Sequence, residues 1–291
     1  MIDHDRLMAY DIPEVRQSYV ARDCAFYALS IGIGQNPMDR TDLRFVGALP
    51  LVPFPTLPLV LGHPGFWLAN PDTGVDARRL VHGEQGITLH APLPAEGTVI
   101  GKTRVTGLVD KGPGRGALLY SEKQLRDAVT GTLYATTRAT IFLRGDGGFG
   151  GPSGPVKPAH AVPETLPVAT RDTTIRPEQA LWYRWNGDNN PLHFDPDIAA
   201  AAGFERPILH GLCSLGVAAH ALVTSLCEGD PSRLDGIDAR FTATVTPGET
   251  LRTEIWPDGS FRVRIVERDV VAIGNGLARI APGSTSSGSA S

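Results

Sequence analysis

A glycine- and proline-rich stretch near the middle of the chain is the feature that most limits the possible folds. Residues 144–155 read Arg-Gly-Asp-Gly-Gly-Phe-Gly-Gly-Pro-Ser-Gly-Pro, and three more prolines follow before residue 168. Such a composition does not support a packed helix or strand. Because it lies almost at the midpoint of a 291-residue chain, we predict a linker over residues 145–168. This linker would separate two halves of similar size, residues 1–144 and 169–281.

Each half begins with a helix-like stretch and continues with strand-like runs. Residues 21–33 are amphipathic and residues 208–226 are apolar, so both predict helices. The predicted strands are rich in Val, Ile, Thr, Tyr and Leu and are separated by turn residues. They cover residues 86–90, 98–109, 116–124 and 132–143, and then 236–244, 250–256, 260–268 and 270–280.

The two halves also share a local pattern. Residues 87–98 and residues 239–250 both read as a strand, a proline-marked turn and a new strand, which indicates an internal duplication. A helix followed by an antiparallel meander, occurring twice, predicts an α+β architecture. One helix wrapped by such a sheet is a hot-dog fold, so we expect a double hot dog, two helix-wrapped antiparallel sheets in tandem.

Composition narrows the functional classes. The net charge is −4 and no basic face is visible, which argues against a nucleic-acid partner. The apolar run around residues 57–61 is too short and too proline-rich to span a membrane. Three cysteines, Cys24, Cys213 and Cys227, match no metal or redox spacing, so we expect a reducing, cytoplasmic location.

The chain ends carry no recognisable targeting signal. The first residues are polar and acidic and do not resemble a secretory signal. Residues 282–291 contain only Pro, Gly, Ser, Thr and Ala, which predicts a disordered tail. They do not end in the Ser-Lys-Leu peroxisomal signal.

The polar, turn-rich segment 183–196 carries the most chemical information. Asp188 and His193 lie five residues apart in it. A carboxylate and an imidazole on one loop can hold a water molecule and move its protons. The helix expected to begin near Gly211 offers free backbone N–H groups that can polarise a carbonyl. Glycine suits this position because a ligand can approach its backbone closely.

Other interpretations of these residues remain open from spacing alone. Asp188 could cap a turn, and His193 and His210 could be buried core histidines. His193, Asp195 and His210 could ligate a metal, although no close ligand cluster accompanies them, and we expect no metal. Ser214 lacks the glycine pattern of a nucleophile elbow.

The chain resembles a known family over nearly its whole length. Residues 183–213 are similar to the signature of the (R)-specific enoyl-CoA hydratase 2 group within the MaoC-like hot-dog hydratases. The matching residues are Tyr183-Arg184, Gly187-Asp188, Asn190-Pro191-Leu192-His193, Asp195-Pro196, Ala202-Gly203-Phe204 and Pro207 to Cys213. The first half resembles the hydratase domain of peroxisomal multifunctional enzyme type 2 and bacterial relatives. There the matching residues are Asp42 to Phe45, Leu57-Pro58, His82 to Gln85, Asp110 to Gly112 and Gly147 to Gly151.

The resemblance implies one active site per chain. It implies that Asp188 and His193 are catalytic, that Asn190 orients them, and that the Gly211 N–H binds the thioester oxygen. It also implies that the first repeat has lost its own catalytic loop and opens an acyl pocket, that no cofactor is needed, and that the protein is a homodimer. We predict further substrate-binding residues at Tyr183, Gly187, His210, Glu84 and Arg240.

Two departures from the family pattern stand out. Asn186 occupies a position where relatives commonly have serine, and asparagine keeps a polar, turn-compatible side chain. Relatives often carry a glutamate shortly after the segment 42–45, whereas residues 45–50 here contain no acid. The second departure predicts an altered pocket or substrate at this point.

The expected function is the reversible hydration of a trans-2-enoyl-CoA to a (3R)-3-hydroxyacyl-CoA. In this hypothesis Asp188 takes a proton from water, and His193 holds the water and returns a proton to the α-carbon, although the two roles could be exchanged. Alternatives are a hydratase or dehydratase of a branched, dicarboxylic or sterol side-chain acyl-CoA, a non-catalytic acyl-CoA binding protein, and a thioesterase. The expected partner is acyl-CoA, with no nucleic acid and no membrane.

Overall fold

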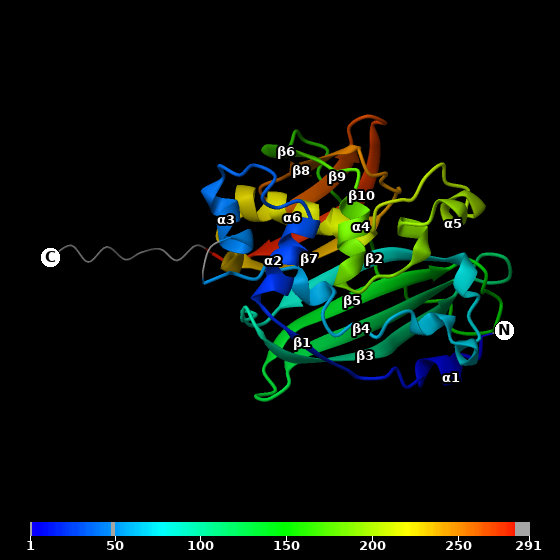
Figure 1. Cartoon of the computed structure of the whole chain (residues 1–291). Helices are drawn as coiled ribbons and strands as arrows, with labels where there is room; N and C mark the ends of the chain where they lie inside the picture. Colours follow the sequence, from blue (N-terminus) through cyan, green and yellow to red (C-terminus); the bar gives the residue numbers. More distant parts are fainter. Residues whose placement is uncertain (1, 48–49, 283–291) are drawn as a thin grey trace.

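A computed structural model describes residues 2–47 and 50–282. Its centre is one antiparallel sheet with helices against it (Figure 1). The strands are β1 (Val15–Tyr19), β2 (Leu80–Leu89), β3 (Gly97–Asp110), β4 (Ala117–Asp127), β5 (Leu133–Leu143), β6 (Ala169–Thr174), β7 (Leu234–Phe241), β8 (Thr250–Ile255), β9 (Ser260–Ile265) and β10 (Val270–Ile280). The helices are α1 (His4–Met8), α2 (Ala21–Ser30), α3 (Arg40–Val46), α4 (Gln179–Tyr183), α5 (Pro196–Ala201) and α6 (Gly211–Leu226).

The sheet shows the internal duplication directly. Its strand order is β1-β3-β4-β5-β2-β7-β10-β9-β8-β6, so the first half reads outward as 2-5-4-3-1 and the second as 7-10-9-8-6. Each strand of the first half therefore has a counterpart in the second. The halves join where β2 and β7 pair antiparallel, with Glu84 opposite Arg240 and Gly86 opposite Asp238. The predicted α+β duplication is confirmed.

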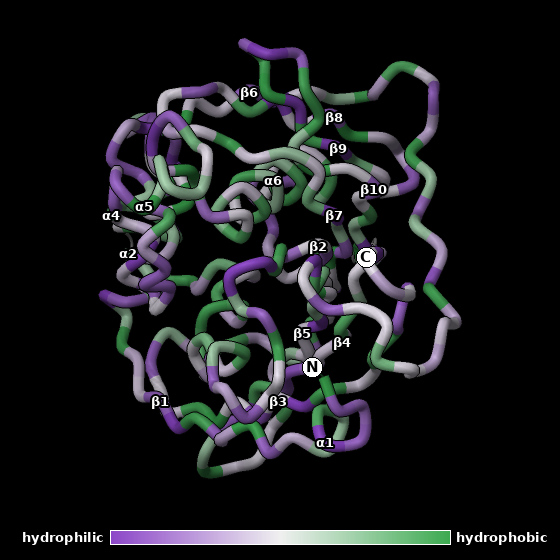
Figure 2. The backbone as a smooth tube through the Cα atoms, turned by 90° about the vertical axis from the view of Figure 1, so that its right-hand side faces the viewer, coloured by the Kyte–Doolittle hydropathy of each residue, from purple (hydrophilic) through white to green (hydrophobic). Residues whose placement is uncertain are grey.

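Helix α6 is the helix that the second half of the sheet wraps. It contains no proline, and it is hydrophobic on nearly all sides, as a fully buried helix should be. It contacts β6, β7, β8 and β10, and α2, α4, α5 and α6 all lie on the same side of the sheet (Figures 1 and 2). The core is continuous across both halves. Gly216 of α6, for example, lies so close to Ile31 that an added Cβ would be 2.6 Å from Ile31 Cγ2.

The prediction that α2 has the same role in the first half is wrong. Helix α2 follows β1 as α4 follows β6, so α2 is the counterpart of α4. The counterpart of α6 would lie in the segment before β2, where the described residues 50–79 form only short 3-10 turns, among them η1 (Leu57–Leu59) and η2 (Trp67–Ala69). Prolines 53, 55, 58 and 64, together with the positive φ angles of Gly62 and Gly65, explain why no long helix forms there. The space beside β2–β5 is therefore not filled by a helix.

The linker and the edge strands complete the fold. Strand β5 ends at Leu143 and β6 begins at Ala169, and the residues described between them form no regular element. The linker is held against β9 and β10, because His160 bonds Ser260 Oγ and Asn275 Nδ2 donates to the His160 carbonyl.

The edge strands β1 and β6 were not predicted. A disordered tail was predicted for residues 282–291, and residues 283–291 lie outside the described part of the chain. Ala48, in the segment where relatives often carry a glutamate, also lies outside it. None of the described helices has the length and apolar composition that crossing a bilayer requires.

Candidate active site

The loop between α4 and η6 (Pro191–His193) positions the predicted catalytic residues. Gly187 has a φ of +113°, a left-handed conformation that lets the chain turn sharply after the 3-10 turn η5 (Arg184–Asn186). Asn186 Nδ2 donates to Ser30 Oγ and to the Tyr183 carbonyl, both at 2.9 Å, so this asparagine attaches the loop to α2. Asn190 Oδ1 accepts from the Leu192 N–H at 3.1 Å and starts η6.

Asp188, His193 and His210 come together at one point. A carboxylate oxygen of Asp188 and a ring nitrogen of each histidine all lie within 4.8 Å of one another. Asp188 is exposed to a pocket, and its Oδ1 accepts the Asn190 N–H at 3.2 Å. A separation of this size leaves room for a water molecule bonded to two of these groups.

His193 is oriented as a proton acceptor. It is 9% exposed, and its Nδ1 lies 2.9 Å from the Ile208 carbonyl oxygen. Because a carbonyl can only accept, Nδ1 carries the hydrogen and Nε2 keeps a lone pair in the neutral ring. Burial lowers the pKa of His193 below its ordinary value, which keeps the ring neutral at pH 7.

His210 and Tyr183 support this pair from behind. The His210 ring stacks on His193 with centroids 3.7 Å apart, and His210 Nε2 lies 3.4 Å from the Asp188 carbonyl. Burial and the neighbouring His193 lower the pKa of His210 to about 3. Tyr183 is fully buried with its ring centroid 4.9 Å from that of His210. His210 and Tyr183 therefore pack against the residues that hold the loop in place.

The N-terminus of α6 lies at the same end of the pocket. Helix α6 begins at Gly211 after His210, and Leu212 lines the pocket. Within the described parts of the chain, the Gly211 and Leu212 N–H groups donate no hydrogen bond. An added Cβ at Gly211 would be 3.2 Å from the Phe241 ring, so the position is closely packed on one side. Free N–H groups at the start of a 16-residue helix can stabilise a developing negative charge.

The pocket beside Asp188 has a volume of about 180 Å³. It occupies the space that a counterpart of α6 would fill in the first half. One wall is the segment 59–68, and the other is the inner face of strands β2–β5. Its polar residues other than Asp188 are His63, His82, Gln85, Thr103, Ser121, Lys123 and Thr137. Sequence reasoning missed this set, because its members meet only through strand pairing.

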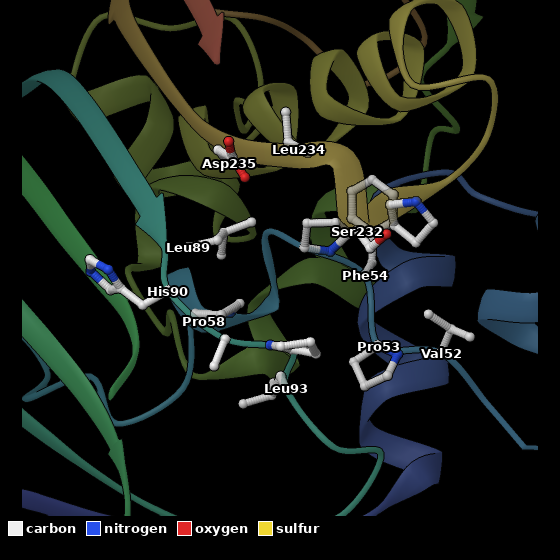
Figure 3. A pocket seen from close by; sticks show the side chains of 14 residues that line it. Val52, Pro53, Phe54, Pro58, Leu89, His90, Leu93, Ser232, Leu234 and Asp235 are labelled. Atoms are coloured by element: carbon white, nitrogen blue, oxygen red, sulfur yellow. The ribbon is translucent and has the colours of Figure 1, made fainter. Parts of the chain in front are cut away.

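A second pocket, of about 210 Å³, lies between residues 52–58, 89–93 and 231–235 (Figure 3). Pro58 lines this pocket. It precedes β2 by almost the same number of residues as Gly211 precedes β7, so Pro58 is the counterpart of Gly211 in the first half. A proline has no N–H to donate. The second pocket therefore has no N–H donor at Pro58, and it contains none of the predicted site residues.

The structure does not bring Glu84 and Arg240 to the site. Arg240 Nη2 lies 2.6 Å from Glu84 Oε1, and Thr140 Oγ1 donates to Glu84 Oε2 at 2.9 Å. Gln85 lines the pocket, and because neighbouring side chains on a strand point to opposite faces, Glu84 points outward. A β-bulge between His82 and Glu84 places His82 and Gln85 on the same inner face, although three positions separate them.

Comparisons with known proteins agree with this geometry. Residues 17–145 match the model of the MFE-2 hydratase 2 N-terminal domain, and residues 158–278 match the MaoC like domain. The chain is 39% identical over 284 residues to "Enoyl-CoA hydratase 2, peroxisomal" from Arabidopsis thaliana, covering 91% of each chain.

Two solved structures are similar in fold. The MaoC-like dehydratase from Phytophthora capsici is 33% identical, with a TM-score of 0.83 over 95% of this chain and 98% of that one. A Mycobacterium tuberculosis protein described as having a double hotdog fold has 15% identity and a TM-score of 0.56, over 93% of this chain and 94% of that one. The latter likeness concerns the fold alone and agrees with the predicted double hot dog.

Proposed function

The chain belongs to the MaoC-like enoyl-CoA hydratase 2 family, and from this we propose that Asp188 and His193 form the acid–base pair of its reaction. The protein is an (R)-specific enoyl-CoA hydratase, which reversibly adds water to a trans-2-enoyl-CoA and forms a (3R)-3-hydroxyacyl-CoA. One observation supports the residue assignment above all others. The Asp188 carboxylate, which lines a pocket, lies within 4.8 Å of a ring nitrogen of the neutral His193.

In this mechanism a water molecule binds between the two acceptors. The water oxygen attacks the β-carbon of the enoyl group while the Asp188–His193 pair takes one of its protons. The electrons of the double bond move onto the thioester, and the resulting enolate oxygen accepts the Gly211 N–H. The pair then returns a proton to the α-carbon, so all atoms of one water molecule end in the product. Because the two groups are coupled, they act as one acid–base unit.

We propose that the reaction needs no metal or other cofactor. Asp188, His193 and His210 offer ligand atoms close enough for a metal ion. However, the two imidazole rings are stacked, with their planes 27° apart, and His193 Nδ1 is already bonded to Ile208. Stacked rings direct their nitrogens side by side, whereas metal ligands converge on one point. Water and substrate supply every atom that the acid–base mechanism requires.

The pocket beneath segment 59–68 is proposed to hold the acyl chain. It begins at Asp188 and Leu212 and extends over the inner face of the first half of the sheet. We also propose a homodimer and a cytoplasmic location. Family resemblance supports the dimer, and three free, buried cysteines are compatible with a reducing compartment. Sedimentation of the purified protein would test the dimer.

An assay of the purified protein tests the function. The substrate is crotonyl-CoA or a medium-chain trans-2-enoyl-CoA, and its conjugated-enoyl absorbance should fall at a rate proportional to the enzyme concentration. The product should be the (R) isomer. A free thiol reagent should detect no released CoA. An (S) product, or CoA release matching the absorbance loss, would contradict the proposed function.

A further inference from the structure

We propose that the far part of the acyl pocket is a subsite for a carboxylate at the end of the acyl chain, so that ω-carboxylated trans-2-enoyl-CoA thioesters are the preferred substrates. This inference rests on the hydratase activity proposed above and concerns the chemistry of the chain that the pocket accepts.

A buried lysine supplies the positive charge of this subsite. Lys123 of β4 is 5% exposed and lines the pocket. Its Nζ donates to the carbonyl oxygens of Pro58, Leu59 and Leu61, at 3.0, 3.2 and 2.5 Å. These bonds satisfy its donors but leave its charge uncompensated, because no carboxylate among the described residues forms an ion pair with it. A buried charge without a counter-ion is costly.

Two neighbouring side chains offer hydrogen-bond donors without partners. Thr103 of β3 is 7% exposed, and its Oγ1 has no hydrogen-bond partner within the described parts of the chain. His63 Nδ1 accepts the Gly65 N–H at 3.1 Å, so in the neutral ring the hydrogen is on Nε2. His63 is exposed to solvent on one side, but the protein atoms packed around it and the charge of Lys123 lower its pKa to about 4, so the ring is neutral at pH 7. Both residues line the pocket.

A carboxylate matches these groups better than an alkyl end. It has only acceptor oxygens and carries the charge that Lys123 lacks, whereas an alkyl end would leave the Thr103 hydroxyl unpaired. Among the residues that the structure describes, the only carboxylate lining the pocket is Asp188, at its reacting end. Lys123 of β4 pairs with Thr103 of β3, whereas Asp188 lies on the loop between η5 and η6. A carboxylate bound by Lys123 and Thr103 would therefore contact the sheet wall of the pocket, and not the loop that carries Asp188.

The test compares matched substrates. kcat/KM would be measured for pairs of trans-2-enoyl-CoA thioesters that have the same chain length and end in a carboxylate or a methyl group, together with ω-hydroxy chains. Because hydrogen bonds to charged groups contribute about 1.5–3 kcal/mol, the carboxylate should be preferred by about tenfold or more at the best chain length. Equal kcat/KM for the carboxylate and methyl chains, or for the carboxylate and hydroxyl chains, overturns the subsite.

Variants then assign the preference to its residues. T103V should lower the carboxylate-to-methyl ratio, and K123M should lower it further. T253V is the matched control. Thr253 of β8 is 1% exposed, and its Oγ1 also has no partner among the described residues, but it lies in the other half of the sheet and outside the pocket. T253V should leave the ratio unchanged, and equal effects of T103V and T253V would overturn the assignment.

A pH profile of the same ratio provides a test without mutation. Burial lowers the pKa of Lys123 to about 7, so the lysine is charged below this pH and loses its charge above it. The ratio should therefore be highest near pH 6 and fall as the pH rises through 7. The other titratable groups that line the pocket are His63, His82 and Asp188, and both histidines have lowered pKa values and are neutral over this range. A ratio that rises with pH contradicts the subsite. Absence of turnover with every thioester would instead refute the hydratase function itself.

Discussion

Replacing Gly211 by proline isolates the backbone N–H that we assign to the thioester oxygen. Gly211 is the first residue of α6, and proline is favoured at this position because its N–H is not needed within the helix. The preceding residue, His210, has φ −61° and ψ 133°, the extended conformation that a residue before proline adopts. The backbone should therefore accept proline while losing one donor.

The expected loss comes from that donor. Removal of one donor to a developing oxyanion typically costs about 2.7–4 kcal/mol, or a factor of about 10²–10³ in kcat. Steric effects must be separated from this loss, because any added Cβ meets the Phe241 ring at 3.2 Å. G211A provides the control, since it adds the same Cβ and keeps the N–H.

The assay is enoyl-CoA hydration by wild type, G211A and G211P, with the unfolding midpoints of the variants compared by circular dichroism. G211P should be slower than G211A by about 10²–10³ in kcat, with similar unfolding midpoints. Equal kcat values for the two folded variants would refute the assignment of this N–H to the reaction.

Three further predictions concern protonation, metal and the outer ion pair. Because burial lowers the pKa of His193 and its neutral form is required, kcat/KM should decline only below the usual histidine value of about 6.5, and a decline beginning above that pH would contradict the assignment. Dialysis against a chelator should leave kcat unchanged; a loss that zinc restores would show that Asp188, His193 and His210 hold a metal. E84Q breaks a half-exposed pair on the outer face, so it should change stability by about 1 kcal/mol or less and leave KM nearly unchanged, whereas a tenfold higher KM would place Glu84 in the substrate site.

The proximity of Asp188 and His193 could be predicted from sequence because both lie on one short loop. Asp188, Asn190 and His193 lie within six residues, so the turn that holds them brings them together whatever the rest of the fold does. Gly211 could be predicted because a helix start is a local feature, and α6 does begin there. The packing of His210 could not be predicted from sequence. His210 stacks behind His193, and such burial depends on Tyr183 and on the rest of the core.

The pocket could not be predicted because it arises from a missing element. An amphipathic pattern over residues 21–33 predicted a helix correctly, but the pattern does not say which helix of a repeat it is. The structure shows that α2 corresponds to α4 and that short 3-10 turns replace the long helix. Lys123 and His63 acquire their surroundings only through this replacement.

The sequence also could not predict which side chains of β2 face the pocket and which face outward. Simple alternation would place Glu84 on the same face as His82. The bulge between these residues shifts the alternation, so that Gln85 faces the pocket and Glu84 faces outward. A bulge of one residue leaves no clear local signal, and it determines which residue of this motif can touch substrate.

The most direct test of the account is the hydration rate of D188N on a trans-2-enoyl-CoA. This substitution keeps the shape of the side chain and removes its charge. Because Asp188 is exposed, the fold should be retained, and circular dichroism would check this. The acid–base mechanism predicts a decrease in kcat of about 10²–10⁴ with the fold retained. A correctly folded D188N enzyme with near-normal kcat would contradict the central claim that Asp188 and His193 together carry out the chemistry.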